Sequence, residues 1–325
     1  MAVIDTKGYI RGAVGPSVFR RAWGKNIVQA KPRKFKPSAA SVESSSEFGL
    51  ISSTAACIRH AFAPAIRYYD GAAVGRTTSA VSASVRGSAG TRRCHRDLHD
   101  GDLSPLLGLE FNRHSRLQDV LRLRAEVQRD AGGQLRVQLP ALDMRRDLRL
   151  PDALKYKGQR MQIRFLLIGF NFRENYYEYI DHRELEYRRG EPSEAQSITF
   201  EGDVPAGCML LLSMSVSLYE SNALDQEDVL LNSLQFSPCA LIGAWQAAEV
   251  IALEEAKPAE EKAGRYMMGY SGNEILASLA SRIKRKAKDP GKRTWSTASA
   301  VARSQVPGSP GKDDLPIIKG RRISF

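Results

Sequence analysis

The sequence predicts a mainly β protein: an antiparallel β-sandwich with helical additions and extended basic arms. One observation is a series of short apolar segments of strand length between residues 132 and 219, separated by glycine-containing turns at Gly132–Gly133, Gly158, Gly190 and 202–207. Another is that no long helical segment lies between these strands, which argues against a doubly wound α/β sheet. The third is a net charge of +12 that is concentrated at the two ends of the chain.

The two ends of the 325-residue chain are basic and its middle is acidic. Residues 1–40 hold nine Lys and Arg against one Asp, a net charge of +8, and residues 281–325 hold twelve against three Asp, a net charge of +9. The residues between them therefore carry a net charge of −5. Basic ends attract nucleic acid, an acidic membrane surface, or an acidic surface on another copy of the protein. The opposite charge of the middle favours the last of these partners.

Composition divides the chain into five segments. The expected segments are a basic extended arm at 1–40, a helix and a Ser/Gly/Arg-rich loop at 41–102, the β-sandwich core at 103–222, a helical extension at 223–289, and a basic C-terminal arm at 290–325.

Within the first arm, alternation in the segments 18–23 and 26–31 predicts a basic and aromatic hairpin. The prolines of residues 31–37 exclude a helix there and predict extended chain. Apolar residues three and four apart predict a helix that begins near residue 41 and ends at Pro64, followed by a loop at 71–101.

The strand series itself begins with a hairpin around Gly132–Gly133, because Leu135, Val137 and Leu139 alternate with polar residues. The segment 161–172 is apolar on both faces, which is typical of a central strand. After the last strand, the sequence predicts a helix at about 240–255 and an amphipathic helix at 272–289.

Motifs that carry enzyme chemistry are missing from the sequence: it holds no GxSxG, no P-loop, no HExxH and no GxGxxG after a strand. His95 and His99 are spaced as a metal pair on a helix, or are incidental histidines of a polar loop. His182 lies beside Asp181 and Glu184, as a general base or as part of a solvated charged face. We expect no enzyme activity, no metal, no cofactor and no small-molecule substrate.

The remaining features concern the thiols and the location of the protein. The four cysteines have no CxxC spacing and are expected to be ordinary small apolar residues. No apolar run is long enough for a membrane span, and the first residues lack the apolar region of a classical signal peptide. We therefore expect a cytoplasmic protein or a component of an assembled particle.

Contacts with partners are expected from the basic and aromatic residues of the two ends, either by pairing with a neighbouring subunit or by neutralising phosphates and stacking on bases. These candidate residues are Arg20, Arg21, Trp23, Lys31, Arg33, Lys34, Lys36, Arg282, Lys284, Arg285 and Lys286.

The opening of the chain also carries a pattern of glycines, a Trp and a basic Lys–Pro run. Its residues are Gly8, Gly12, Gly15, Val18, Trp23, Gly24, Lys31, Pro32, Arg33 and Lys34, followed by Phe48–Gly49 and by strands at 135–142 and 208–219. In this pattern the chain resembles an uncharacterised bacterial family with a glycine-punctuated basic N-terminal segment and a β-rich C-terminal half. The resemblance covers about residues 1–220 and implies no known activity. The loop at 71–101 and the chain after about residue 222 depart from the family's pattern.

These observations together predict a non-enzymatic structural protein. We expect copies of the chain to assemble into a filament, shell or surface layer by exchanging arms between subunits. The alternative is a nucleic-acid-binding protein that uses the same basic arms.

Overall fold

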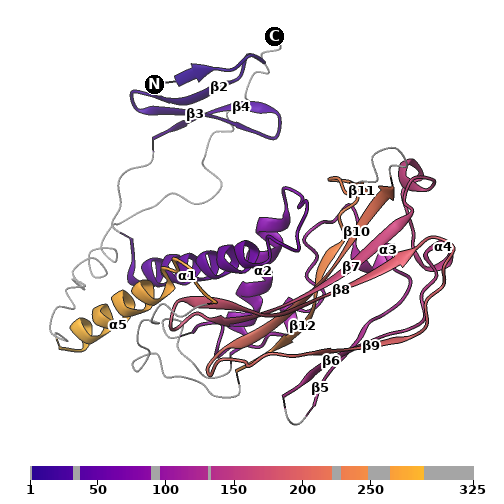
Figure 1. Cartoon of the computed structure of the whole chain (residues 1–325). Helices are drawn as coiled ribbons and strands as arrows, with labels where there is room; N and C mark the ends of the chain where they lie inside the picture. The colour runs from indigo at the N-terminus through magenta and orange to yellow at the C-terminus, as the bar shows by residue number, and fades with distance from the viewer. Residues whose placement is uncertain are drawn as a thin grey trace, which may run out of the picture. The chain divides into compact units, whose positions relative to one another are not determined.

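A computed structural model describes residues 2–31, 37–88, 96–130, 133–221, 228–247 and 264–288, with side chains described as far as residue 282. The fold is mixed α/β with more strand than helix, and it contains several antiparallel sheets, one of them curled into a half-barrel (Figure 1). The strands are β1 (Ala2–Ile4), β2 (Ile10–Val14), β3 (Ser17–Ala22), β4 (Lys25–Ala30), β5 (Glu126–Arg129), β6 (Leu135–Leu139), β7 (Arg160–Asn171), β8 (Tyr176–Arg188), β9 (Gln196–Phe200), β10 (Met209–Ser221), β11 (Asp228–Leu230), β12 (Cys239–Trp245) and β13 (Arg265–Met267). The helices are α1 (Ala39–Ala61), α2 (Ala73–Arg86), α3 (Leu117–Val120), α4 (Met144–Asp147) and α5 (Gly272–Lys288), with 3₁₀ turns η2 (Ser104–Leu106) and η3 (Asp152–Leu154).

The largest sheet has the strand order β11-β10-β7-β8-β13, with β12 also paired to β10. Strand β7 is central, because it pairs with β8 along its whole length and with β10 from Arg160 to Phe170. Its side chains are buried on both faces of the sheet, as its sequence predicts. Register shifts at Leu167/Ile168 and Leu212/Ser213 mark bulges, which bend a sheet and increase its twist.

Different layers cover the two faces of this sheet. On one face, alternate residues of β7 such as Ile168 and Phe170 pack with α1 and α2. On the other face, residues such as Phe165 pack with Val137 of β6 and Ile198 of β9, which belong to the three-stranded sheet β5-β6-β9. The structure thus confirms a strand-rich antiparallel fold, but it does not show the predicted β-sandwich: one covering layer is helical, and the strands curl into a half-barrel.

Helix α1 lies where the spacing of apolar residues predicts it, whereas α2 corrects the prediction of a loop at 71–101. The side chain of Ser38 accepts a hydrogen bond from the backbone N–H of Ser41 and caps the start of α1. The buried residues of α2 include Thr77, Val81 and Val85, which recur at helical spacing. Their small side chains allow α2 to pack closely, but the same composition is typical of loops.

The region after β10 also differs from its prediction. Residues 239–245 form strand β12 and not the start of a helix, because a short apolar run fits both structures until its pairing partner is known. Residues 248–263, which hold the rest of that predicted helix, lie outside the described residues. The hairpin β5–β6 and the helix α5 confirm their predictions.

The described part of the predicted N-terminal arm is a folded element and not an extended chain. Strands β1 to β4 form a four-stranded antiparallel sheet in chain order, and its last two strands confirm the predicted hairpin. The C-terminal arm at 290–325 lies outside the described residues. None of the helices that the structure describes is long and apolar enough to cross a membrane.

Candidate assembly surface on the N-terminal sheet

The N-terminal sheet, residues 2–31, is shaped by tight turns that its sequence encodes. The carboxylate of Asp5 accepts hydrogen bonds from the backbone N–H groups of Lys7, at 3.0 Å, and Tyr9, at 2.9 Å, within the β1–β2 turn. Gly15 takes a φ of 55° at the first position of the β2–β3 turn, before Pro16. Each turn holds neighbouring strands in a fixed antiparallel register.

This sheet has no core of its own, since none of the residues from 2 to 31 that the structure describes is buried. Val3, Ile4, Val14 and Val28 keep between 56% and 67% of their surface exposed. Small sheets require a covered apolar face to be stable in water. The N-terminal sheet therefore presents apolar surface that a partner can cover.

Trp23 occupies the tip of the β3–β4 hairpin in an unusual conformation. Its φ is 51° and that of Gly24 is 75°, so both central residues of the turn have positive φ, as in a type I′ turn. Asn and Gly suit such a position, whereas a bulky side chain there costs roughly 1–2 kcal/mol. The Trp side chain is 92% exposed, so contacts within the chain do not repay this cost. An exposed aromatic residue on a rigid turn is the kind of residue that anchors protein interfaces.

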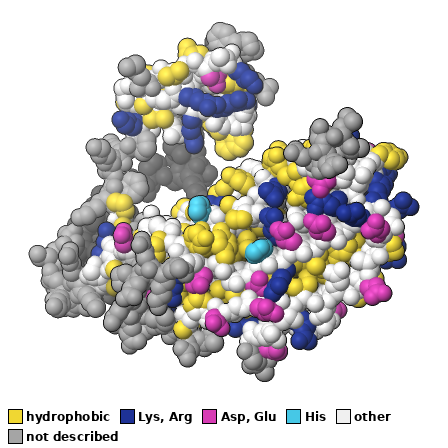
Figure 2. Space-filling model, in the orientation of Figure 1, with side chains coloured by type: hydrophobic (Ala, Val, Ile, Leu, Met, Phe, Trp, Pro, Cys, Tyr) yellow, Lys and Arg dark blue, Asp and Glu magenta, His cyan; other side chains and the backbone are white. Residues whose placement is uncertain are grey.

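Basic side chains lie among the apolar ones on the sheet, as Figure 2 shows. Residues 2–31 contain six Lys and Arg against Asp5, a net charge of +5. The guanidinium of Arg21 lies 3.9 Å from the centre of the Tyr9 ring, an arrangement that favours cation–π attraction. Arg20, Arg21 and Lys31 are exposed, so their charges are available to a partner.

The structure brings together only some of the predicted contact residues. Arg20, Arg21, Trp23 and Lys31 share the N-terminal sheet or adjoin it. Arg282 is exposed on α5 and belongs to the second of two compact units, residues 281–325. The side chains of Lys284, Arg285 and Lys286, and the whole of Arg33, Lys34 and Lys36, lie outside the described residues.

The sequence prediction missed the exposed aliphatic residues of the sheet, Val3, Ile4, Val14 and Val28. Their signal is the run of aliphatic residues in strands of a segment of about thirty residues, which is too short to bury a core by itself. Because successive residues of a strand point to opposite faces, Val3 and Ile4 leave apolar side chains uncovered on both faces of the sheet.

An acidic surface lies on strand β8 and the loops that follow it. Residues 174–203 contain nine Asp and Glu against three Arg, a net charge of −6. Glu184 and Asp181 already pair with arginines of the same sheet, Arg164 and Arg183. Glu191, Glu194 and Asp203 are exposed and make no ion pair among the described residues. They are therefore available to a basic partner; we call residues 174–203 the acidic segment.

The histidines that sequence analysis singled out are separated in the fold. His182 is exposed on the charged outer side of β8, whereas His99 is buried and its Nε2 accepts a hydrogen bond from the N–H of Phe172 at 3.0 Å. Burial lowers the pKa of His99 to about 4, although the nearby Asp97 opposes this shift. His95 lies outside the described residues, within which no group of three or more His, Cys, Asp and Glu could hold a metal.

The described thiols and one carboxyl group are also in apolar surroundings. Burial raises the pKa of Cys57 and Cys208 to about 11, and Cys239 is buried as well, so all three are protonated at neutral pH. Burial raises the pKa of Glu110 to about 7, while its Oε1 accepts a hydrogen bond from the N–H of Leu117. Cys94 lies outside the described residues.

The fold is strand-rich and antiparallel, and its small N-terminal sheet is basic and carries an exposed Trp. Comparison with models of protein families, with curated proteins and with solved structures found no match. The resemblance of residues 1–220 to a bacterial family therefore stays a prediction.

Proposed function

We propose that this chain is a non-enzymatic structural protein whose copies assemble with one another through the N-terminal sheet. The observation that carries the proposal is a folded sheet with exposed Val3, Ile4, Val14 and Val28 and no buried residue. In this proposal the sheet, with the basic residues that follow it, takes the place of the exchanged arm. Its edge strands β1 and β4 offer backbone groups for strand addition to a neighbour.

A second copy is the partner that the charges favour. The sheet carries +5 and the acidic segment carries −6, so each copy offers both halves of a complementary pair. Because the two surfaces are different parts of the chain, copies can be joined head to tail, which is a heterologous contact. The filament, shell or layer of this proposal uses that arrangement, which continues from copy to copy, whereas reciprocal docking of the same two surfaces would close a twofold dimer.

The alternative, nucleic-acid binding, is favoured by one observation on the same sheet. Arg20 and Arg21 are exposed on the strand that leads to Trp23, so cations and a stacking surface are close together in the chain. This reading predicts binding to single-stranded DNA or RNA that weakens steeply with salt.

Replacing Trp23 with Asn tests the proposal, because Asn suits positive φ and keeps the turn intact. We expect W23N to weaken association of the full chain at least tenfold, measured by sedimentation equilibrium. The matched control is Y156N, which removes an aromatic side chain that is 84% exposed on the body. Association of Y156N should stay within twofold of the parent.

Two results would contradict self-assembly. One is a parent chain that stays monomeric at all concentrations; the other is equal association of W23N and the parent. A monomer that binds single-stranded DNA with a steep salt dependence, and that loses this binding on W23N, would establish the alternative.

A further inference from the structure

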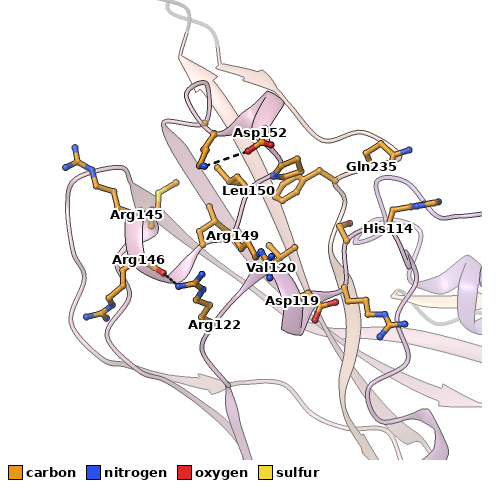
Figure 3. Close-up of a pocket in the computed structure, with 18 of the residues that line it drawn as sticks. His114, Asp119, Val120, Arg122, Arg145, Arg146, Arg149, Leu150, Asp152 and Gln235 are labelled. Carbon is orange, nitrogen blue, oxygen red and sulfur yellow. Dashed lines mark hydrogen bonds and ion pairs between the residues drawn. The ribbon is translucent and has the colours of Figure 1, made fainter.

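A cavity of about 1060 Å³ opens beside the short helices α3 and α4. Figure 3 shows that arginines from several chain segments project around it. Its charged and polar lining residues are His114, Ser115, Arg116, Asp119, Arg122, Arg145, Arg146, Arg149, Asp152, Lys155, Arg189 and Gln235. Its volume is close to the upper limit for small-molecule sites, which is roughly 1,000 Å³.

Backbone hydrogen bonds fix the two main segments of this basic pocket against each other. The N–H of Arg122 donates to the carbonyl oxygen of Asp147 at 2.9 Å, and that of Arg149 donates to Val120 at 2.8 Å. Between these bonds, Leu121 and Leu148 form a β-bridge. The arginines therefore project from a support whose geometry is set before a ligand arrives.

The charges of the pocket are unbalanced. Seven basic side chains line it, and the acidic residues of its lining are Asp119 and Asp152. Arg146 pairs with Asp147 at 2.9 Å and Lys155 lies 3.7 Å from Asp152. The other five make no ion pair among the described residues; they are Arg116, Arg122, Arg145, Arg149 and Arg189.

The pocket is positively charged although residues 41–280, which include it, together carry a net charge of −5. Like charges gathered in one concave site repel one another, and a bound anion relieves that repulsion. The pocket is therefore arranged for a ligand with several negative charges.

The side chains around the pocket indicate the chemical class of that ligand. Six of the seven cations are arginines, whose planar fork of donors matches phosphate oxygens two at a time. The aromatic lining residues are His114 and Phe236, and Phe236 is fully buried, so the pocket offers little surface on which a base could stack. We propose that this pocket binds a short chain of linked phosphates, recognised by charge and not by a base.

Isothermal titration of the full chain with tripolyphosphate, in the dispersed W23N background, tests this proposal independently of assembly. The double variant R145Q/R149Q removes two pocket cations and should weaken binding at least tenfold. The control R136Q/R188Q removes two exposed cations outside the pocket and should change affinity less than twofold. Both variants lower the net charge equally, so binding to the basic ends of the chain is matched.

Equal loss of affinity in the two double variants would overturn the proposal, because it would show binding by net charge alone. R145K/R149K keeps the positive charges but removes the planar guanidinium groups, so it should bind tripolyphosphate with intermediate affinity. Binding by this variant would also show that changes at these two positions do not unfold the protein. Citrate should bind at least tenfold more weakly than tripolyphosphate. A ten-nucleotide DNA that binds more tightly than tripolyphosphate, and loses that affinity on R145Q/R149Q, would replace the proposal with nucleic-acid recognition.

Discussion

His99 shows how one side chain takes its role from its surroundings and not from its neighbours in sequence. Its ring packs against that of Phe172, and its Nε2 accepts a hydrogen bond from the backbone N–H of Phe172. It also lies near Asp97 and the buried guanidinium of Arg173. Arg173 donates to Asp97 at 2.7 Å and to Asp100 at 2.9 Å, so the charges beside His99 are already paired. Sequence alone shows two histidines four residues apart, and it cannot show that this one is enclosed.

The burial of His99 predicts a loss of stability in acid. Its pKa is about 4 in the folded chain and about 6.5 in the unfolded chain, so between these values only the unfolded chain takes up the proton. The free energy of unfolding should therefore fall as pH drops from about 6.5 to about 4, by about 3 kcal/mol in total from this residue.

Urea unfolding of the parent and of H99Q, at pH 7 and at pH 4.5, measures this contribution. The Gln side chain keeps an acceptor for the N–H of Phe172 but does not titrate. The parent should lose more stability than H99Q between the two pH values. Equal losses would show that His99 does not carry the effect and would leave the carboxylates as its source.

At the scale of elements, regular alternation and strong apolar spacing could be predicted from the sequence, and composition misled where side chains are small. Strand β7 and helix α1 follow directly from their patterns. Helix α2 was missed because Thr77, Ser84 and their neighbours are typical of loops until they are packed against another element. The basic pocket could not be foreseen, since Arg116, Arg149 and Arg189 are far apart in sequence. Clusters such as the two arginines after Met144 are its only local signal.

Two glycines test how closely α2 is packed. A Cβ on Gly101 would lie 2.5 Å from the carbonyl oxygen of Ser84 in α2, so backbone must move to admit it. A Cβ on Gly75, within α2, would meet nothing within 4 Å. We expect G101A to destabilise the fold by about 1–3 kcal/mol, and G75A to stabilise it by up to about 1 kcal/mol.

Urea unfolding at neutral pH measures both changes, and each variant is the control for the other because both convert Gly to Ala. A stability of G101A equal to that of the parent would contradict the close approach of residue 101 to α2. A destabilised G75A would contradict the helical, exposed position of residue 75.

For the whole molecule, the distribution of charge links the two proposals. The basic pocket and the N-terminal sheet are local concentrations of positive charge in a chain whose middle is acidic. A phosphate ligand in the pocket would make the body still more negative and would strengthen its attraction for the basic sheet of another copy. Binding and assembly would then be coupled through charge, without any change in shape.

Charge reversal tests the contact between copies directly. R20E/R21E places two carboxylates on the N-terminal sheet and lowers its net charge from +5 to +1. It should weaken association at least about a hundredfold, because most of the attraction of the sheet for the acidic segment of the next copy is removed. E191K/E194K reverses two exposed, unpaired carboxylates of that segment and should have the same effect. Combining all four changes sets the new carboxylates of the sheet against the new lysines of the acidic segment and should recover association to within about tenfold of the parent, measured by sedimentation at low salt. Raising the salt concentration should weaken the parent and the combined variant alike. If the fourfold variant stays as dispersed as either pair, the sheet does not dock on the acidic segment, and assembly must use another surface.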